Sequence, residues 1–230
     1  MKFKITSMIV LVLAVLILGV GCGKLSRMEE YMEIIGRASA IDSYMYEARS
    51  EGDAKNKAAI QTVWISGKKA KSEIVFNDNP EQSIIAILNL DKKEHFLYYK
   101  EIRSAIQLTS IGKMSDFELP FMSKEKLANL KEENIKSIEP DKIKDLDCTK
   151  IVIEEEQKHT FLKIHLWYDK STGLLAKYEI LRDDKVERSQ TYQNLKVLKI
   201  EDDIFTLPEG TTIQKNYSLE TMKLLIKEIS

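Results

Sequence analysis

Three histidines are the side chains most able to bind a metal ion or transfer a proton: His95, His159 and His165. A zinc site needs several such ligands around one ion. If one strand ran through His159 and His165, their side chains would share a face but lie about 20 Å apart, because a strand rises about 3.3 Å per residue. We therefore interpret the histidines as surface or rim residues, and we expect no metal site and no cofactor.

An acidic run, Glu154-Glu155-Glu156, contains the residue types of an acid–base pair or a calcium site. Neighbouring side chains on a strand point to opposite faces, so these carboxylates do not converge. A solvated strand end is the better interpretation. The sequence also lacks the motifs HExxH and CxxC, a phosphate loop and a nucleophile elbow. We expect no catalytic residues and no enzyme activity.

Four aromatic residues, Trp64, Tyr98, Tyr99 and Trp167, could line a sugar or lipid site. Such residues more often serve as core side chains and cross-strand pairs. We favour that structural role for all four.

Cys22 is the residue with the clearest chemical prediction. Lys2 and Lys4 precede an uncharged stretch from Ile5 to Val20, and Gly21 precedes the cysteine. This layout is typical of a secretory signal peptide, and the apolar part is short for a membrane-spanning helix. Residues 18–22, LGVGC, resemble a lipobox, although Gly19 stands where a branched apolar residue is usual. We predict a signal peptide over 1–21 and lipid attachment, such as palmitate, at Cys22; the alternative is an uncleaved N-terminal anchor helix.

The other cysteine, Cys148, has no partner within the chain if Cys22 is acylated, so no intramolecular disulfide is expected. A small buried residue at the start of a strand is the simplest interpretation. An intermolecular bridge or a reactive thiol remains an alternative. The formal net charge of −1 offers no basic surface for nucleic acid.

The hydrophobic pattern predicts one domain over 28–230, joined to the lipid by a tether over 22–27. Apolar residues from Met28 to Ile41 recur at helical spacing, with Ser26 as a plausible cap. A period of two then predicts strands. Their ranges are 43–49, 60–65, 69–76, 84–90, 95–99, 104–109, 149–155, 161–168, 174–181 and 186–198. Between them, 123–135 is predicted as a helix and 138–147, which contains Pro140, as a loop. Ser218 opens a predicted last helix.

Two segments carry a family resemblance. The "W-x-D-x-x-T-G-L" hairpin of LolA-like lipoprotein-sorting proteins is similar to residues 165–174, HLWYDKSTGL. The closing "D-x-x-F-x-x-P-x-G" segment of that family is similar to residues 202–210, DDIFTLPEG. The resemblance covers roughly 28–213 and is strongest over 147–213. It implies an α+β fold: a curved antiparallel sheet, the LolA-like half-barrel, with packed helices, to which this chain adds a C-terminal helix.

The resemblance also implies a function without catalysis. Lipidated relatives include the spore-germination lipoproteins of clostridia, which act as partners and activators of a cortex amidase (CwlD-like). This chain is then expected on the extracytoplasmic face of a membrane, such as that of a spore, as the partner of a cell-wall amidase. Exposed strand edges would also permit a strand-swapped homodimer.

The alternative function is a carrier or sensor of lipids or lipoproteins, which would use an apolar cavity inside the half-barrel. The inside of the sheet discriminates between the two. If side chains such as Trp64, Phe76 and Phe96 fill it, acyl chains have no room.

Overall fold

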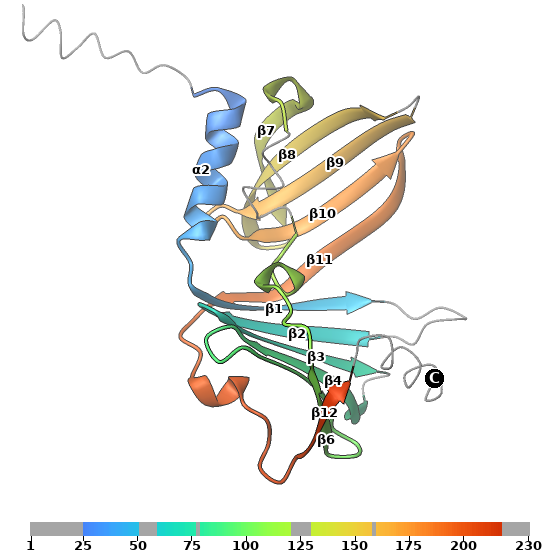
Figure 1. Ribbon diagram of the computed structural model, residues 1–230. Helices are drawn as coiled ribbons and strands as arrows, with labels where there is room; N and C mark the ends of the chain where they lie inside the picture. The colour runs from blue at the N-terminus through green and yellow to red at the C-terminus, as the bar shows by residue number, and fades with distance from the viewer. Residues whose placement is uncertain (1–24, 51–58, 77–78, 121–129, 158–159, 218–230) are drawn as a thin grey trace, which may run out of the picture.

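A computed structural model describes residues 25–50, 59–76, 79–120, 130–157 and 160–217 (Figure 1). The predicted signal peptide, Cys22, His159 and the predicted C-terminal helix lie outside these ranges. No helix within them has the length and apolar character needed to cross a membrane.

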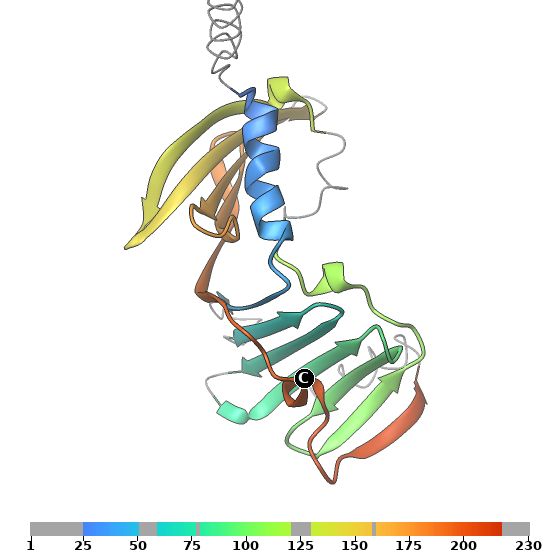
Figure 2. The ribbon, with the colours of Figure 1, turned by 90° about the vertical axis from the view of Figure 1, so that its left-hand side faces the viewer.

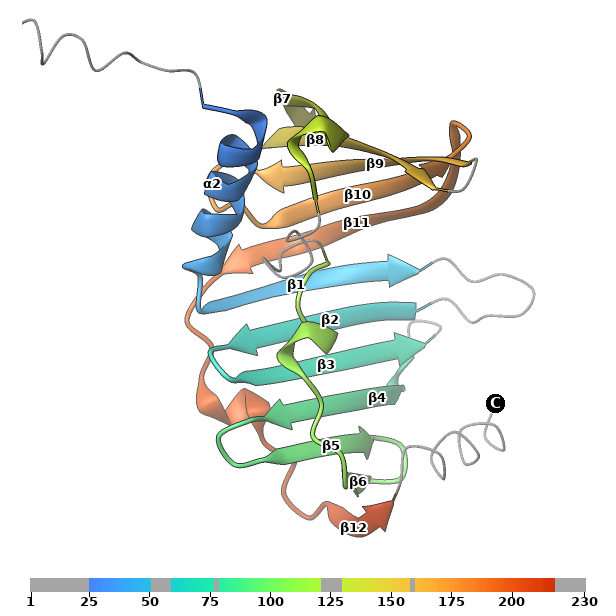
Figure 3. The same ribbon diagram turned by 45° about the horizontal axis from the view of Figure 1, so that its top comes forward.

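Twelve strands form one sheet in the order β12-β6-β5-β4-β3-β2-β1-β11-β10-β9-β8-β7 (Figure 3). Every neighbouring pair is antiparallel except β12 and β6. The strands are β1 (Ser43–Ser50), β2 (Ala59–Ser66), β3 (Lys69–Phe76), β4 (Asn79–Asn89), β5 (Glu94–Tyr99), β6 (Ser104–Leu108), β7 (Ile135–Ile143), β8 (Leu146–Gln157), β9 (Thr160–Asp169), β10 (Leu175–Arg182), β11 (Lys185–Val197) and β12 (Thr212–Tyr217). Three short 3-10 helices, η1 (Met114–Asp116), η2 (Glu132–Asn134) and η3 (Asp202–Phe205), lie in the connections.

This architecture corrects the predicted fold class. An α+β fold with several packed helices is wrong, because the described residues form one open, curved sheet with a single α-helix, α2 (Arg27–Ser39). The curved, mainly antiparallel sheet with a helix against one face does agree with the LolA-like sheet that the sequence motifs imply.

Helix α2 begins as its sequence predicts. The Glu29 amide donates to the Ser26 hydroxyl, and the Ser26 amide donates to the Glu29 carboxylate, which completes a capping box. Its buried residues are Tyr31, Ile34, Ile35 and Ala38. We call the sheet face that packs against these residues the inner face, and the opposite face the outer face. Figure 2 shows α2 lying along the β7–β10 half of the sheet.

The middle of the chain differs from the prediction. Residues 138–147, expected as a loop, belong mainly to β7 and its hairpin with β8. A proline is tolerated in β7 because this strand lies at the edge of the sheet, where one side needs no ladder hydrogen bonds. Of the helix expected over 123–135, residues 123–129 lie outside the described ranges; the described end of this segment is not α-helical, since η2 leads directly into β7 at Ile135.

Candidate functional site

The inner face of the β7–β10 half is packed by the chain itself. Tyr31 and Ile35 of α2 are completely buried, as are Leu166 and Tyr168 of β9, and all belong to one core cluster. The Tyr31 and Tyr168 hydroxyls lie 2.9 Å apart and form a hydrogen bond. Burial raises the pKa of Tyr31 to about 12 and raises that of Tyr168 well above its usual value. Both phenols therefore remain neutral groups of the buried core.

The inner face of the other half is covered by the connection after β6. Phe117 and Leu119 of this segment are buried against a cluster that includes Tyr46 and Val63. The Tyr46 hydroxyl donates to the Phe117 carbonyl oxygen over 2.7 Å. Within the described residues, much of the inner face is therefore core rather than open surface.

The three side chains that could have filled the inside of the sheet do not gather there. Trp64 pairs with Met45 and Lys71 in the sheet. It directly follows the inner-face residue Val63 on β2, so it lies on the outer face. Phe96 packs in a separate cluster with Ile87 on the outer face. Phe76 is half-buried at the end of β3. The inner face is filled mainly by tyrosines, isoleucines and leucines instead.

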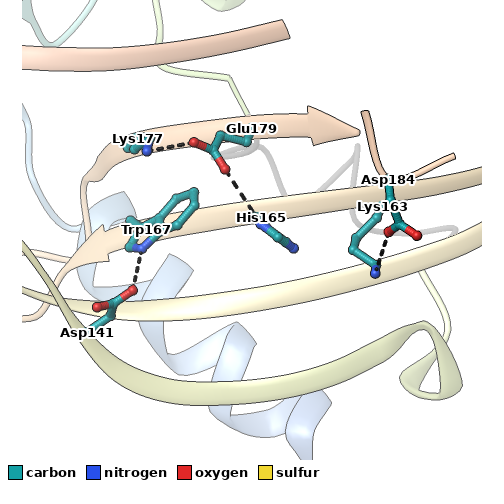
Figure 4. Close-up of polar contacts among 7 residues, drawn as sticks. All are labelled: Asp141, Lys163, His165, Trp167, Lys177, Glu179 and Asp184. Atoms are coloured by element: carbon teal, nitrogen blue, oxygen red, sulfur yellow. Dashed lines mark hydrogen bonds and ion pairs between the residues drawn. The ribbon is translucent and has the colours of Figure 1, made fainter. Parts of the chain in front are cut away.

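The outer face of β7–β10 carries an ordered cluster of aromatic and charged side chains (Figure 4). We call it the outer patch; its members are Asp141, Lys150, Lys163, His165, Trp167, Lys177, Glu179 and Asp184. Strand register brings them together. Trp167 pairs with Lys150 on one side and with Lys177 on the other, and His165 pairs with Glu179.

Trp167 is the centre of the outer patch. Its indole Nε1 donates to the Asp141 carboxylate over 2.8 Å. The Nζ atoms of Lys150 and Lys177 lie 5.1 and 4.6 Å from the ring centroid, within the range of a cation–π interaction. The Trp167 side chain is only 6% exposed, so the surface that a partner would meet consists of the surrounding charges.

Ion pairs fix the remaining charges of the patch. Lys177 lies 2.7 Å from Glu179, and Lys163 lies 3.1 Å from Asp184. The His165 Nδ1 atom is 3.7 Å from a Glu179 oxygen. Burial and the nearby Lys150 lower the pKa of His165, whereas the hydrogen bond from Trp167 lowers that of Asp141. At neutral pH the patch combines a neutral imidazole with fixed lysines and carboxylates, a composition suited to recognition of a protein surface.

The histidines predicted as rim residues lie apart. His95 accepts a hydrogen bond from the Gly112 amide over 3.2 Å and contacts Phe117, far along the sheet from His165 on β9. Among the described residues, no group of three His, Cys, Asp or Glu side chains is arranged to hold a metal ion.

The acidic run and Cys148 have structural roles. Glu154 pairs with Lys163 over 3.4 Å, while the side chain of Glu156 lies outside the described part. Cys148 is buried beside Trp167 and Ala176. Burial and the neighbouring Asp169 raise the pKa of its thiol to about 11, which keeps it protonated.

The four aromatic candidates form no shared site. Tyr98 and Tyr99 are neighbours on β5 and belong to different core clusters. Trp64 and Trp167 are separated in the sheet by β1, β11 and β10. Sequence reasoning missed Asp141, because Pro140 led us to assign its segment to a loop, and residues 135–143 show no regular alternation of apolar and polar side chains that would have indicated a strand.

No family model and no curated protein sequence matches this chain. Solved structures with a similar fold include MucB, at 11% identity and a TM-score of 0.49, covering 82% of this chain and 66% of MucB. MucB in complex with MucA(peri) matches at 10% identity and a TM-score of 0.49, covering 80% and 61%. A DUF1329 family protein from Desulfovibrio piger matches at 14% identity and a TM-score of 0.36, covering 79% and 98%. This chain thus spans just under two thirds of MucB, and no function follows from likenesses at this level.

Proposed function

We propose that this chain is an extracytoplasmic lipoprotein, anchored through Cys22, that binds a protein partner without catalysing a reaction. The observation that carries the proposal is the outer patch. It is a sheet face of β7–β10 on which an aromatic ring, lysines and carboxylates are held in a fixed arrangement. Interfaces gain specificity and association rate from such complementary charges.

The packed inner face supports a partner rather than a lipid as the ligand. An acyl chain would have to displace α2, whose Tyr31 and Ile35 are completely buried against the sheet. Removing a large apolar side chain from a core costs about 2–5 kcal/mol. Occupation of this site by lipid would therefore cost more than binding to a preformed cavity.

The edge of β7 is poorly suited to strand addition. It carries Pro140 together with Lys136 and Lys142, and prolines and lysines on an edge strand oppose pairing with another chain. We therefore assign partner binding to the outer patch and not to this edge. A strand-swapped homodimer through β7 is disfavoured for the same reason.

A cell-wall amidase is the partner class that we propose. The short tether over 22–27 would hold the domain close to the membrane. This identity rests on the resemblance in layout to clostridial spore-germination lipoproteins, which combine a lipobox with a LolA-like domain.

The test uses the full mature lipoprotein in detergent and the purified cell-wall amidase of the same host. Titration calorimetry would compare wild type with a Lys150→Glu/Lys177→Glu variant of the outer patch. We expect a complex that the double charge reversal weakens by at least about tenfold.

The matched control is Lys71→Glu, because the Lys71 Nζ atom lies 5.1 Å from the Trp64 ring in an equivalent pair on the other half of the sheet. This variant should bind like wild type. If no complex forms, or if Lys71→Glu loses as much affinity for the amidase as the double variant, the assignment of partner binding to the outer patch is contradicted.

A further inference from the structure

A second site lies on the outer face of the other half of the sheet. A cavity of about 540 Å³ opens between β3–β5 and the segment 208–211. Its volume falls in the range of small-molecule sites, roughly 300–1,000 Å³. Six charged residues line it: Lys71, Glu73, Glu81, Lys100, Arg103 and Glu209.

Both walls of the cavity are fixed. On one side, Ile85 and Tyr98 are buried and form an apolar base, against which Leu207 packs. On the other side, the Thr211 hydroxyl donates to the Pro208 carbonyl oxygen over 2.6 Å. The Thr212 amide then donates to the Arg103 carbonyl oxygen over 3.1 Å, which ties the segment to the turn just before β6. The cavity is therefore a feature of the folded chain and needs no closure.

The charges of the cavity are balanced but incompletely paired. Lys100 lies 3.8 Å from Glu81. Four of the lining residues have no ion pair within 4 Å in the described part of the chain: Lys71, Arg103, Glu73 and Glu209. Burial lowers the pKa of Lys71 and Lys100 adds to this effect, while the neighbouring Glu73 opposes it. Two cations and two carboxylates are thus available to a ligand.

We propose that this cavity binds a short peptide through its free amino and carboxyl termini. A simple anion or cation would be attracted by one pair of charges and repelled by the other, whereas a zwitterion can satisfy both. Tyr98 and Ile85 provide the apolar surface for the part of the peptide between its ends. The site goes beyond the proposed partner module and involves other residues.

The position of the cavity favours a soluble ligand over a lipid headgroup. It lies on β3–β5, whereas the chain leaves toward its N-terminus from the start of α2, at the opposite end of the molecule (Figure 1). A headgroup of the anchoring membrane would therefore lie away from the cavity.

The experiment titrates the full mature lipoprotein with trialanine as the zwitterionic probe, followed by calorimetry. N-acetyl-trialanine lacks the positive charge of the probe, trialanine amide lacks the negative charge, and the doubly blocked peptide lacks both. We expect trialanine to bind and each block to weaken binding by about tenfold or more, as the loss of a charged hydrogen bond does.

Two variants test the two poles of the cavity. Lys71→Met should weaken the binding of trialanine, and blocking the carboxylate of the peptide should then cause no further loss of affinity. Glu73→Gln should likewise weaken the binding of trialanine, with no further loss of affinity when the amine is blocked. Lys185→Met, an exposed control on β11, should bind like wild type, and melting curves should match for all variants. No heat with trialanine, or equal affinity for the doubly blocked peptide, would overturn the proposal. Either result leaves amidase binding by the outer patch unaffected.

Discussion

Gly173 couples the β9–β10 turn to helix α2. Its φ is +75°, and a Cβ atom placed there would collide with the Ile34 carbonyl oxygen of the helix. The Asp169 carboxylate holds the same turn by accepting hydrogen bonds from the Ser171 amide and the Thr172 hydroxyl. Position 173 therefore requires glycine both for its backbone conformation and for the space it leaves.

Gly173→Ala should lower the free energy of unfolding by more than about 2 kcal/mol, because the cost of positive φ adds to the contact with backbone. Urea unfolding followed by circular dichroism measures this change. Gly67→Ala is the control, since Gly67 also has positive φ (+56°) but nothing lies within 4 Å of its added Cβ. Equal destabilisation by the two substitutions would show that contact with α2 is unimportant.

The buried tyrosines should make stability fall in alkali. The pKa of Tyr31 is raised to about 12, and the pKa values of Tyr44, Tyr46, Tyr168 and Tyr192 are raised as well, in each case chiefly by burial. Unfolded tyrosine ionises near pH 10. The folded state therefore holds protons that the unfolded state releases, so this stability is complete below about pH 10 and is lost as the pH rises toward and beyond 12.

Above about pH 10, the free energy of unfolding should fall by up to about 1.4 kcal/mol per pH unit for each such tyrosine. Urea titrations at a series of pH values measure it. Tyr31→Phe should make the slope shallower, although the substitution also removes the bond to Tyr168. A flat profile between about pH 9 and 11.5 would contradict the burial of these phenols.

Helix α2 is the element on which the inner face depends. Ser26→Ala removes the side-chain half of the capping box and should cost about 1 kcal/mol of stability. Ser26→Thr keeps the hydroxyl and should retain most of that free energy. Thermal melts of wild type and the two variants measure this difference in stability. Identical melting temperatures would mean that packing alone determines where the helix begins.

Elements with a clear hydrophobic period could be predicted, and others could not. Strand β3 has the predicted bounds, and the Asp169–Gly173 turn joins β9 to β10 as expected. Strand β7 was missed because Pro140 normally interrupts a strand, and only its position at the sheet edge makes it acceptable. Strand β12 was missed because TIQKNY has a weak pattern, and its pairing with β6 depends on residues more than 100 positions away.

At the scale of the whole molecule, the sequence could predict a curved sheet but not its packing. Periodicity shows that a strand has two faces, but it does not show which segment covers each one. The sequence therefore left open whether Trp64 and Phe96 fill the inside of the sheet, and their register places them on the outer face. The outer patch depends on the register of four strands, which a single sequence does not specify.

The proposed lipid anchor at Cys22 leads to a separate prediction about where the protein is found. Cys22→Ser removes the proposed lipid attachment site, so the protein should move from the membrane fraction into the soluble or secreted fraction. Fractionation followed by immunoblotting, with metabolic palmitate labelling, tests it. Cys148→Ser should leave both readouts unchanged, since Cys148 is buried in the fold. Membrane retention without label would favour the uncleaved anchor helix.

The most direct test of the central claim is purification of the tagged lipoprotein from its native host, with mass spectrometry of both the proteins and the lipids that accompany it. Wild type and the Lys150→Glu/Lys177→Glu variant would be compared in sporulating cells. We predict a stoichiometric cell-wall amidase with wild type, its loss from the variant, and no bound lipid beyond the anchor. A stoichiometric lipid or client lipoprotein, held equally by both proteins and without an amidase, would contradict the account and favour a carrier.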